Sequence, residues 1–204
     1  KVYDLSRQAG DIWLWDLTRD LGSRFTVADQ DVRGPVWSPD GSRVLYSVAR
    51  DNFNDLHIKS VGGAGADSLL FASDQDKVAS SWSPDGRWIT YVIRSPTVQR
   101  FDVYGLSLGD STRAVPLVAS PFFESQAVIS PDGKWLAYSS DESGRFESYV
   151  RTFPGSGGKW RVSTAGGGEP AWRGDSMEIY YLSPDGKMMT VSVEPGTPPR
   201  FSLP

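Results

Sequence analysis

The sequence predicts an all-β protein built from repeated, antiparallel four-stranded units, and three observations support this fold class. The tetrapeptide Ser-Pro-Asp-Gly occurs four times, at 38–41, 83–86, 130–133 and 183–186. The first three copies are 45 and 47 residues apart, and the related block 173–176 begins 43 residues after Ser130. No helical hydrophobic period extends beyond a single turn. A period in the mid-forties is typical of four-stranded propeller blades, so we expect a β-propeller.

The first two strands of each unit, A and B, flank a tight hairpin turn. In the tetrapeptide, Pro presets φ, Asp accepts bonds from nearby amides, and Gly adopts the left-handed conformation. An apolar residue lies two positions before a tyrosine in each B strand, so the two share a face that we expect to pack between neighbouring blades. The paired A and B markers lie nine positions apart; they are Trp37 and Tyr46, Trp82 and Tyr91, Ile129 and Tyr138, and Trp172 and Tyr181.

The third strand, C, opens with an acidic residue in every unit, and a shorter fourth strand, D, follows it. The C strands begin at Asp11, Asp55, Asp102 and Glu147, spaced by 44, 47 and 45 residues. We place the D strands near 24–26, 69–71, 116–118 and 160–162. Short strands separated by turn residues favour an all-β fold.

These strands define repeat units of about 11–27, 33–71, 78–118, 125–163 and 169–204, the first with C and D strands only. We therefore expect a single partial β-propeller domain over 1–204, with about four to five blades. Three arrangements are open: a larger propeller of which this is a part, closure of the N-terminal pair onto the last unit, or edges covered by another chain. We favour the larger propeller, because an unclosed fragment would expose strand edges and self-associate.

Composition narrows the classes of function. With 39% hydrophobic and 12% aromatic residues, the 204-residue chain can bury a substantial core. The net charge of −4 and the scattered basic residues argue against nucleic acid as a partner. The absence of cysteine excludes disulfides and thiol chemistry. We recognise no membrane span or signal peptide, and the start at Lys1 suggests a processed protein or an excised segment.

Several residues that resemble catalytic or binding motifs have simpler explanations. His57, the single histidine, occupies the same C-strand position as Trp13, Tyr104 and Tyr149, so we interpret it as structural. The single Gly-x-Ser-x-Gly match, at 105–109, falls in a predicted C strand and its turn with no helix signal after it, so it is no nucleophile elbow and we expect no catalytic residues. The glycine-rich segment 61–65 corresponds to a C to D turn and is not followed by a helix signal, which argues against a phosphate loop. The turn aspartates Asp40, Asp85, Asp132 and Asp185 should bond local backbone.

The connections from D to A and from B to C should share one rim of the propeller, and this rim is predicted to be acidic. Solvated loops would explain the acids; the alternative is a site for a cation such as Ca²⁺, a basic peptide or a cationic partner surface. Two adjacent phenylalanines on the same rim could contact a protein or fill the channel mouth. The candidate rim residues are Asp29, Asp31, Asp51, Asp74, Asp76, Phe122, Phe123, Glu124, Asp141, Glu142 and Glu169, together with Asn54.

The segments 37–46 and 82–91 resemble the WD40-like β-propeller repeat of TolB and its relatives, over roughly residues 11–193. The segment 129–144, with 153–155 and 158–160, is similar to the propellers attached to bacterial transmembrane serine/threonine kinases. This resemblance implies an extracytoplasmic sensor or docking domain, periplasmic or at the cell surface. The chain departs from the repeat pattern at Ile129, at the 173–176 turn and in the shifted 183–186 copy.

Three functions follow from this reading. We favour a non-catalytic binding or sensor domain that engages a protein or small ligand through the rim loops. The alternative is the gating propeller of a prolyl-oligopeptidase-like hydrolase whose catalytic domain lies elsewhere. A third is an assembly role in which edge strands mediate self-association.

Overall fold

The computed structural model describes residues 2–3, 10–27, 31–51, 53–62, 67–94, 100–109, 111–155, 157–194, 196 and 198–204. Every regular element in these ranges is a β-strand, which confirms the all-β prediction. The chain divides into two compact units, Lys1–Ala79 and Ser80–Pro204. The described part contains no helix with the length and apolarity that crossing a bilayer would require.

Unit 1 begins with a three-stranded antiparallel sheet in the order β1-β2-β3. Its strands are β1 (Val2–Tyr3), β2 (Ile12–Asp16) and β3 (Leu21–Arg24). The prediction of only C and D strands here was incomplete, because β1 pairs with β2. Strand D also ends at Arg24 and not at Thr26, because the hydroxyl of Thr26 accepts the Ile12 amide at 2.8 Å.

The remaining four sheets each have four antiparallel strands in sequential order, as the repeat predicts. The second sheet of unit 1 contains β4 (Val32–Trp37), β5 (Arg43–Arg50), β6 (Phe53–Ser60) and β7 (Ser68–Phe71). The third sheet contains β8 (Asp76–Trp82), β9 (Trp88–Arg94), β10 (Phe101–Leu108) and β11 (Thr112–Val118). The last two contain β12 (Glu124–Ile129), β13 (Trp135–Ser140), β14 (Glu147–Thr152) and β15 (Lys159–Arg161), then β16 (Gly168–Trp172), β17 (Glu178–Leu182), β18 (Met188–Glu194) and β19 (Arg200–Phe201).

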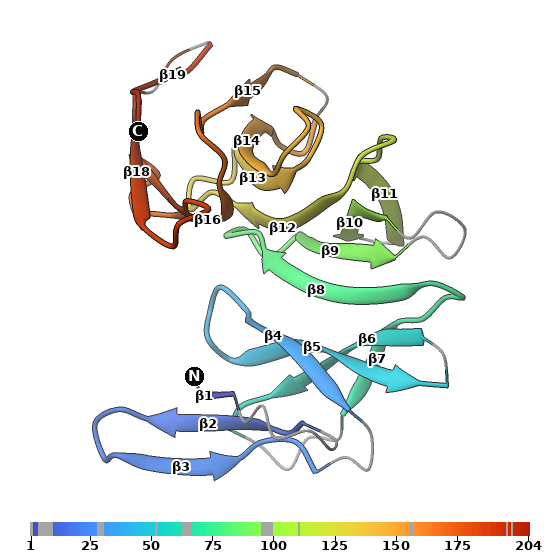
Figure 1. Cartoon of the computed structure of the whole chain (residues 1–204). Helices are drawn as coiled ribbons and strands as arrows, with labels where there is room; N and C mark the ends of the chain where they lie inside the picture. The colour runs from blue at the N-terminus through green and yellow to red at the C-terminus, as the bar shows by residue number, and fades with distance from the viewer. Residues whose placement is uncertain are drawn as a thin grey trace. The chain divides into compact units, whose positions relative to one another are not determined.

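Within unit 2 the sheets follow one another face to face. Strand β12 contacts β9 and β10 of the sheet before it, and β16 contacts β12, β13 and β14 in the same way (Figure 1). Each sheet thus covers the preceding one, which is the packing of successive propeller blades.

The A to B hairpins use the turn chemistry predicted from the tetrapeptide. In the first copy the Ser38 hydroxyl donates to Asp40 Oδ1 at 2.6 Å, which also accepts the Ser42 amide at 3.1 Å. Gly41, Gly86 and Gly133 have φ of 69°, 74° and 71°. In the degenerate turn Ser176 takes the same left-handed conformation, with φ of 64°. The local role predicted for the turn aspartates is therefore confirmed.

The B-strand face forms the centre of the core, as predicted. In unit 1, Val44 and Tyr46 of β5 pack with Ile12, Phe25 and Val32. In unit 2, strand β13 places its Leu136 and Tyr138 against β10 and β11, and strand β17 places its Ile179 and Tyr181 against β13 and β14. Burying one such aliphatic side chain contributes about 1.5–3 kcal/mol.

Candidate functional site

Three phenylalanines meet at the end of unit 2 that carries the D to A and B to C connections. Phe101 begins β10, Phe123 directly precedes β12, and Phe146 directly precedes β14. The ring centroids of Phe101 and Phe123 lie 4.6 Å apart, and those of Phe123 and Phe146 lie 5.5 Å apart, both edge to face. We call these residues and the neighbouring Phe122 the phenylalanine cluster.

Hydrogen bonds fix the backbone that carries this cluster. The amide of Phe123 donates to Asp141 Oδ1 at 2.9 Å, and the amide of Asp141 donates to the Phe123 carbonyl at 3.4 Å. The amide of Phe122 donates to the Ser120 hydroxyl at 3.2 Å. Asp141 therefore positions Phe123 by joining two connections, so its carboxylate already has an internal partner.

The predicted acidic residues of unit 1 are partly engaged in internal contacts. Asp31 accepts bonds from Arg33 and from the Gly10 amide; burial opposes its ionisation, but these bonds hold the pKa of its carboxyl below the usual value. Asp76 accepts two bonds from Asn54, through its amide and its side chain. Asp51 and Asp74 are exposed, and Asp51 has a φ of 51° in the β5–β6 connection. Asp29 lies outside the described residues.

The predicted acidic residues of unit 2 also differ in their surroundings. Both carboxylate oxygens of Glu142 accept bonds from Lys159 Nζ at 2.7 Å. Glu169 is exposed, with a φ of 55° at the start of β16. Glu124 is fully buried at the start of β12, so it does not form part of an exposed acidic rim. Among the described residues, no group of three or more histidine, cysteine or acidic side chains has the geometry to hold a metal ion.

His57 has the structural role that its repeat position predicts. Its ring lies 6.3 Å from that of Tyr46, and its Nδ1 lies 3.1 Å from Asp67 Oδ1. These contacts engage both the face of the ring and one nitrogen.

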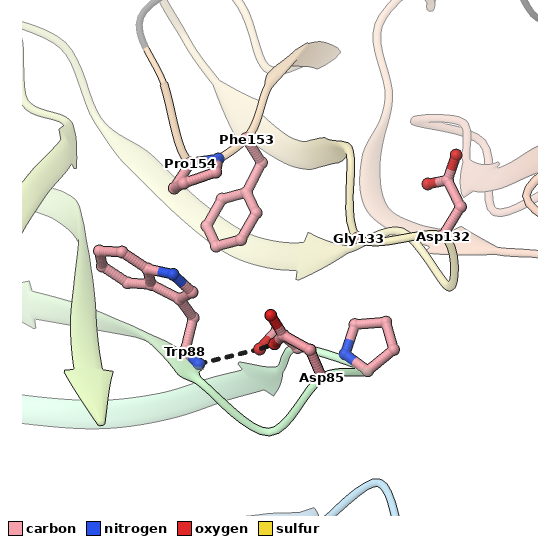
Figure 2. A pocket seen from close by; sticks show the side chains of 8 residues that line it. Asp85, Trp88, Asp132, Gly133, Phe153 and Pro154 are labelled. Atoms are coloured by element: carbon pink, nitrogen blue, oxygen red, sulfur yellow. Dashed lines mark hydrogen bonds between the residues drawn. The ribbon is translucent and has the colours of Figure 1, made fainter. Parts of the chain in front are cut away.

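A small pocket of about 200 Å³ lies at the opposite strand ends of unit 2, between two Ser-Pro-Asp-Gly turns. Figure 2 shows the side chains of Trp88 and Phe153 next to each other on one side of it, with Asp85 below Phe153 and Asp132 on the other side. The Trp88 and Phe153 rings are edge to face, with centroids 5.9 Å apart. The lining residues are Ser83, Pro84, Asp85, Trp88, Asp132, Gly133, Phe153 and Pro154. The bond from the Ser83 hydroxyl lowers the pKa of Asp85, so this wall of the pocket is anionic at neutral pH.

Sequence reasoning missed this pocket and two members of the phenylalanine cluster. The turn aspartates were interpreted one at a time, although two consecutive turns meet at the pocket. Phe101 and Phe146 each lie directly before the acidic residue of strand C, at 102 and 147, and this repeated position was the available signal.

Comparison with solved structures defines the fold. TolB from Acinetobacter baumannii superposes with a TM-score of 0.71 at 14% identity, covering 95% of this chain and 48% of that one. A chain of a nidogen/laminin complex gives a TM-score of 0.67 at 13% identity, covering 91% of this chain and 76% of that one. The fold is that of a TolB-like β-propeller.

A catalytic protein shares this fold as well. A prolyl endopeptidase gives a TM-score of 0.63 at 15% identity, covering 98% of this chain and 33% of the peptidase. The chain thus spans about half the length of the TolB structure and a third of the peptidase. No protein-family model matches the sequence, and no curated protein matches it. The TolB-like fold therefore leaves the function to be argued from the chain's own residues.

Proposed function

We propose that this chain is a non-catalytic binding module that contacts another protein through the phenylalanine cluster. The observation that carries the proposal is the exposure of Phe122 and Phe146, which keep 41% and 44% of their accessible surface. Large aromatic side chains at the centre of an interface contribute most of its binding energy. Two of them on connecting loops that meet at Phe123 would supply such a centre.

The rigidity of the cluster supports the same role. Phe101 and Phe146 hold Phe123 from two sides, and Asp141 fixes its backbone. A surface that is already ordered loses little conformational entropy on binding, so more of the contact energy appears as affinity.

A small-molecule ligand is less well supported. The pocket lined by Trp88, Phe153 and the two turns measures about 200 Å³, whereas pockets for drug-sized ligands measure roughly 300–1,000 Å³. Its size and anionic wall suit a single side chain of a partner. We therefore assign the pocket to recognition of one peptide side chain.

The resemblance to kinase-attached propellers supports a sensor or docking domain outside the cytoplasm. A structural neighbour comes from a nidogen/laminin complex, and this assembly of two proteins supports a protein partner for the fold. Both points support the proposal at the level of fold and repeat sequence.

Photo-crosslinking tests the proposal. Benzoylphenylalanine at position 122 should capture a partner from an extract of the source cells, which mass spectrometry then identifies. The double variant Phe122→Ala with Phe146→Ala should weaken binding of that partner at least tenfold, because it truncates both exposed rings. Isothermal titration calorimetry measures the affinity.

Met177→Ala is the matched control, since Met177 is an apolar residue with 38% exposure beside the hairpin at 173–176. It should leave the affinity unchanged. Equal affinity of the double variant and the unmodified protein would exclude the phenylalanine cluster as the interface.

A second candidate is the gating propeller of a prolyl-oligopeptidase-like hydrolase, favoured by the superposition on a prolyl endopeptidase. The complete reading frame distinguishes the two. A separate α/β-hydrolase domain with a Gly-x-Ser-x-Gly elbow between a strand and a helix, encoded in the same reading frame, would support the gating role. Kinase motifs with a membrane span would support the sensor role.

A further inference from the structure

Lys77, near the start of β8, is fully buried and places its ammonium group among oxygen atoms of unit 1. Its Nζ donates to the carbonyl oxygens of Gln75 at 2.6 Å, Asn54 at 3.1 Å and Ser73 at 3.4 Å. It also donates to Asp55 Oδ1 at 3.2 Å. Three backbone carbonyls and one carboxylate thus surround one positive charge. We call this arrangement the oxygen cage.

The following repeat has the same backbone pairing around this position. In unit 1, Leu56 pairs with Phe71 and the register shifts at the next residue of β6. In unit 2, Val103 pairs with Val118 and the register again shifts at the next residue, here of β10. Corresponding positions are 47 residues apart in both strands. The end of strand D and the start of strand C are therefore equivalent in the two repeats.

The same offset carries every member of the oxygen cage into unit 2. Asp102 takes the place of the carboxylate, and Phe101, Ser120 and Phe122 take the places of the three carbonyl residues. Glu124 takes the place of the lysine. By this correspondence the second cage has the same three backbone positions and the same carboxylate, but a second carboxylate replaces the ammonium group.

Two carboxylate oxygens in the second cage lack hydrogen-bond partners within the described residues: Oε2 of Glu124, whose side chain is fully buried, and Oδ1 of Asp102. The other Glu124 oxygen accepts a bond from the Ser120 hydroxyl. Burial, and then the charge of Asp102, raise the pKa of Glu124. Arg100 Nε lies 3.8 Å from Asp102 Oδ1, too far for a hydrogen bond, and can balance only one of the two negative charges.

Such an arrangement is unfavourable without a further positive charge. A buried carboxylate needs an ion pair, hydrogen bonds, a bound cation or a proton, and an unpartnered charged one costs several kcal/mol. In unit 1 the protein supplies the cation as Lys77. In unit 2 a cation from solvent would fill the same place.

We propose that the second oxygen cage binds one Ca²⁺ ion, with the carboxylates of Asp102 and Glu124 and the backbone carbonyls of Phe101, Ser120 and Phe122 as its ligands. Ca²⁺ takes six to eight oxygen ligands, readily including backbone carbonyls, and water completes the set. Mg²⁺ is less suited, because it demands tighter octahedral geometry and retains its own waters. The site does not depend on whether the phenylalanine cluster binds a partner.

Thermal unfolding and calorimetry of the whole chain test this site with CaCl₂ alone as the probe. One Ca²⁺ should bind per chain, and Tm should rise by roughly 5–10 °C at a hundredfold excess over Kd. MgCl₂ at the same concentration should give a smaller shift. Because no partner protein is present, a failed test of the proposed function leaves this result intact.

Two substitutions at position 124 separate the proposal from its alternatives. Glu124→Gln removes a ligand charge and should abolish the Ca²⁺-dependent shift. Glu124→Lys supplies the ammonium group found in unit 1, so this variant should lose the shift and have a higher Tm than the unmodified protein in EDTA. Glu169→Gln, which changes an exposed acid of the same unit, should keep the full shift.

The outcomes are decisive even if one variant folds poorly. No binding heat and no Tm shift of the unmodified protein at millimolar CaCl₂ would overturn the proposal. A Ca²⁺-dependent shift retained by Glu124→Lys would also overturn it, because the ion would then bind elsewhere.

Discussion

Ser176 shows how one side chain maintains a backbone conformation that usually requires glycine. The three regular turns have glycine at this position, but Ser176 adopts a φ of 64°. Its hydroxyl accepts the Asp132 amide at 3.0 Å, which joins the turns of two successive sheets in unit 2. The hydroxyl bond offsets the strain of a left-handed residue, which is about 1–2 kcal/mol.

We predict that Ser176→Ala lowers the free energy of unfolding by about 1–2 kcal/mol, because the strain stays and the Asp132 amide loses its acceptor. Ser176→Gly loses the same bond but relieves the strain, so it should be more stable than Ser176→Ala. Urea denaturation measures both. Equal stability of the two variants would show that the backbone strain is negligible.

At the level of elements, strand B determines the stability of each repeat. Its apolar residue and its tyrosine are almost completely buried in all four complete sheets. Those of β13 and β17 pack against the sheet before their own. A cavity in strand B is therefore felt by two sheets at once.

We predict that Leu136→Ala lowers the free energy of unfolding by about 2–5 kcal/mol, since the strand cannot close around the missing atoms. Lys134→Ala, two residues earlier and with an exposed side chain, should change it by less than about 0.5 kcal/mol. Denaturant titration followed by tryptophan fluorescence compares them. A cost for Leu136→Ala no larger than that for Lys134→Ala would contradict the packing described for β13.

On the scale of the whole molecule, the carboxylates of the hairpin turns make the free energy of unfolding depend on pH. The bond from the Ser38 hydroxyl lowers the pKa of Asp40 to about 2, and the bond from Arg173 lowers that of Asp175 to about 2. The pKa values of Asp85 and Asp185 are lowered as well. A carboxyl with a lowered folded-state pKa stabilises the fold above its unfolded pKa of 3.8, and that contribution disappears as the pH falls toward 2.

We therefore predict constant turn stability from pH 7 down to about 4 and a progressive loss between about 4 and 2. Carbon NMR of the Asp40 carboxyl should show a midpoint near 2, and Ser38→Ala should move it toward 3.8 by removing the largest cause. A midpoint near 3.8 in the unmodified protein would refute the role assigned to the Ser38 bond.

The repeat, the hairpins and the strand order could be predicted from the sequence, because turn chemistry and period-two patterning are local. Strand β1 could not, since two residues carry no pattern and acquire their conformation from pairing with β2. Among the rim residues, Glu124 was predicted to be an exposed acid of a connecting loop, yet it is buried. Its burial depends on the register between strands far apart in sequence, which composition does not reveal. The role of the other rim acids and a single partial propeller over 1–204 remain predictions.

The equivalent oxygen cages around Lys77 and around Glu124 also bear on how such repeats diverge. Codons for lysine and glutamate differ by a single first-position base. One point mutation in a duplicated blade can therefore replace a lysine ammonium group with a carboxylate that binds a cation from solvent. Ion dependence can therefore arise in one copy of a repeat while its sister copy keeps the protein foldable, without any change in the backbone.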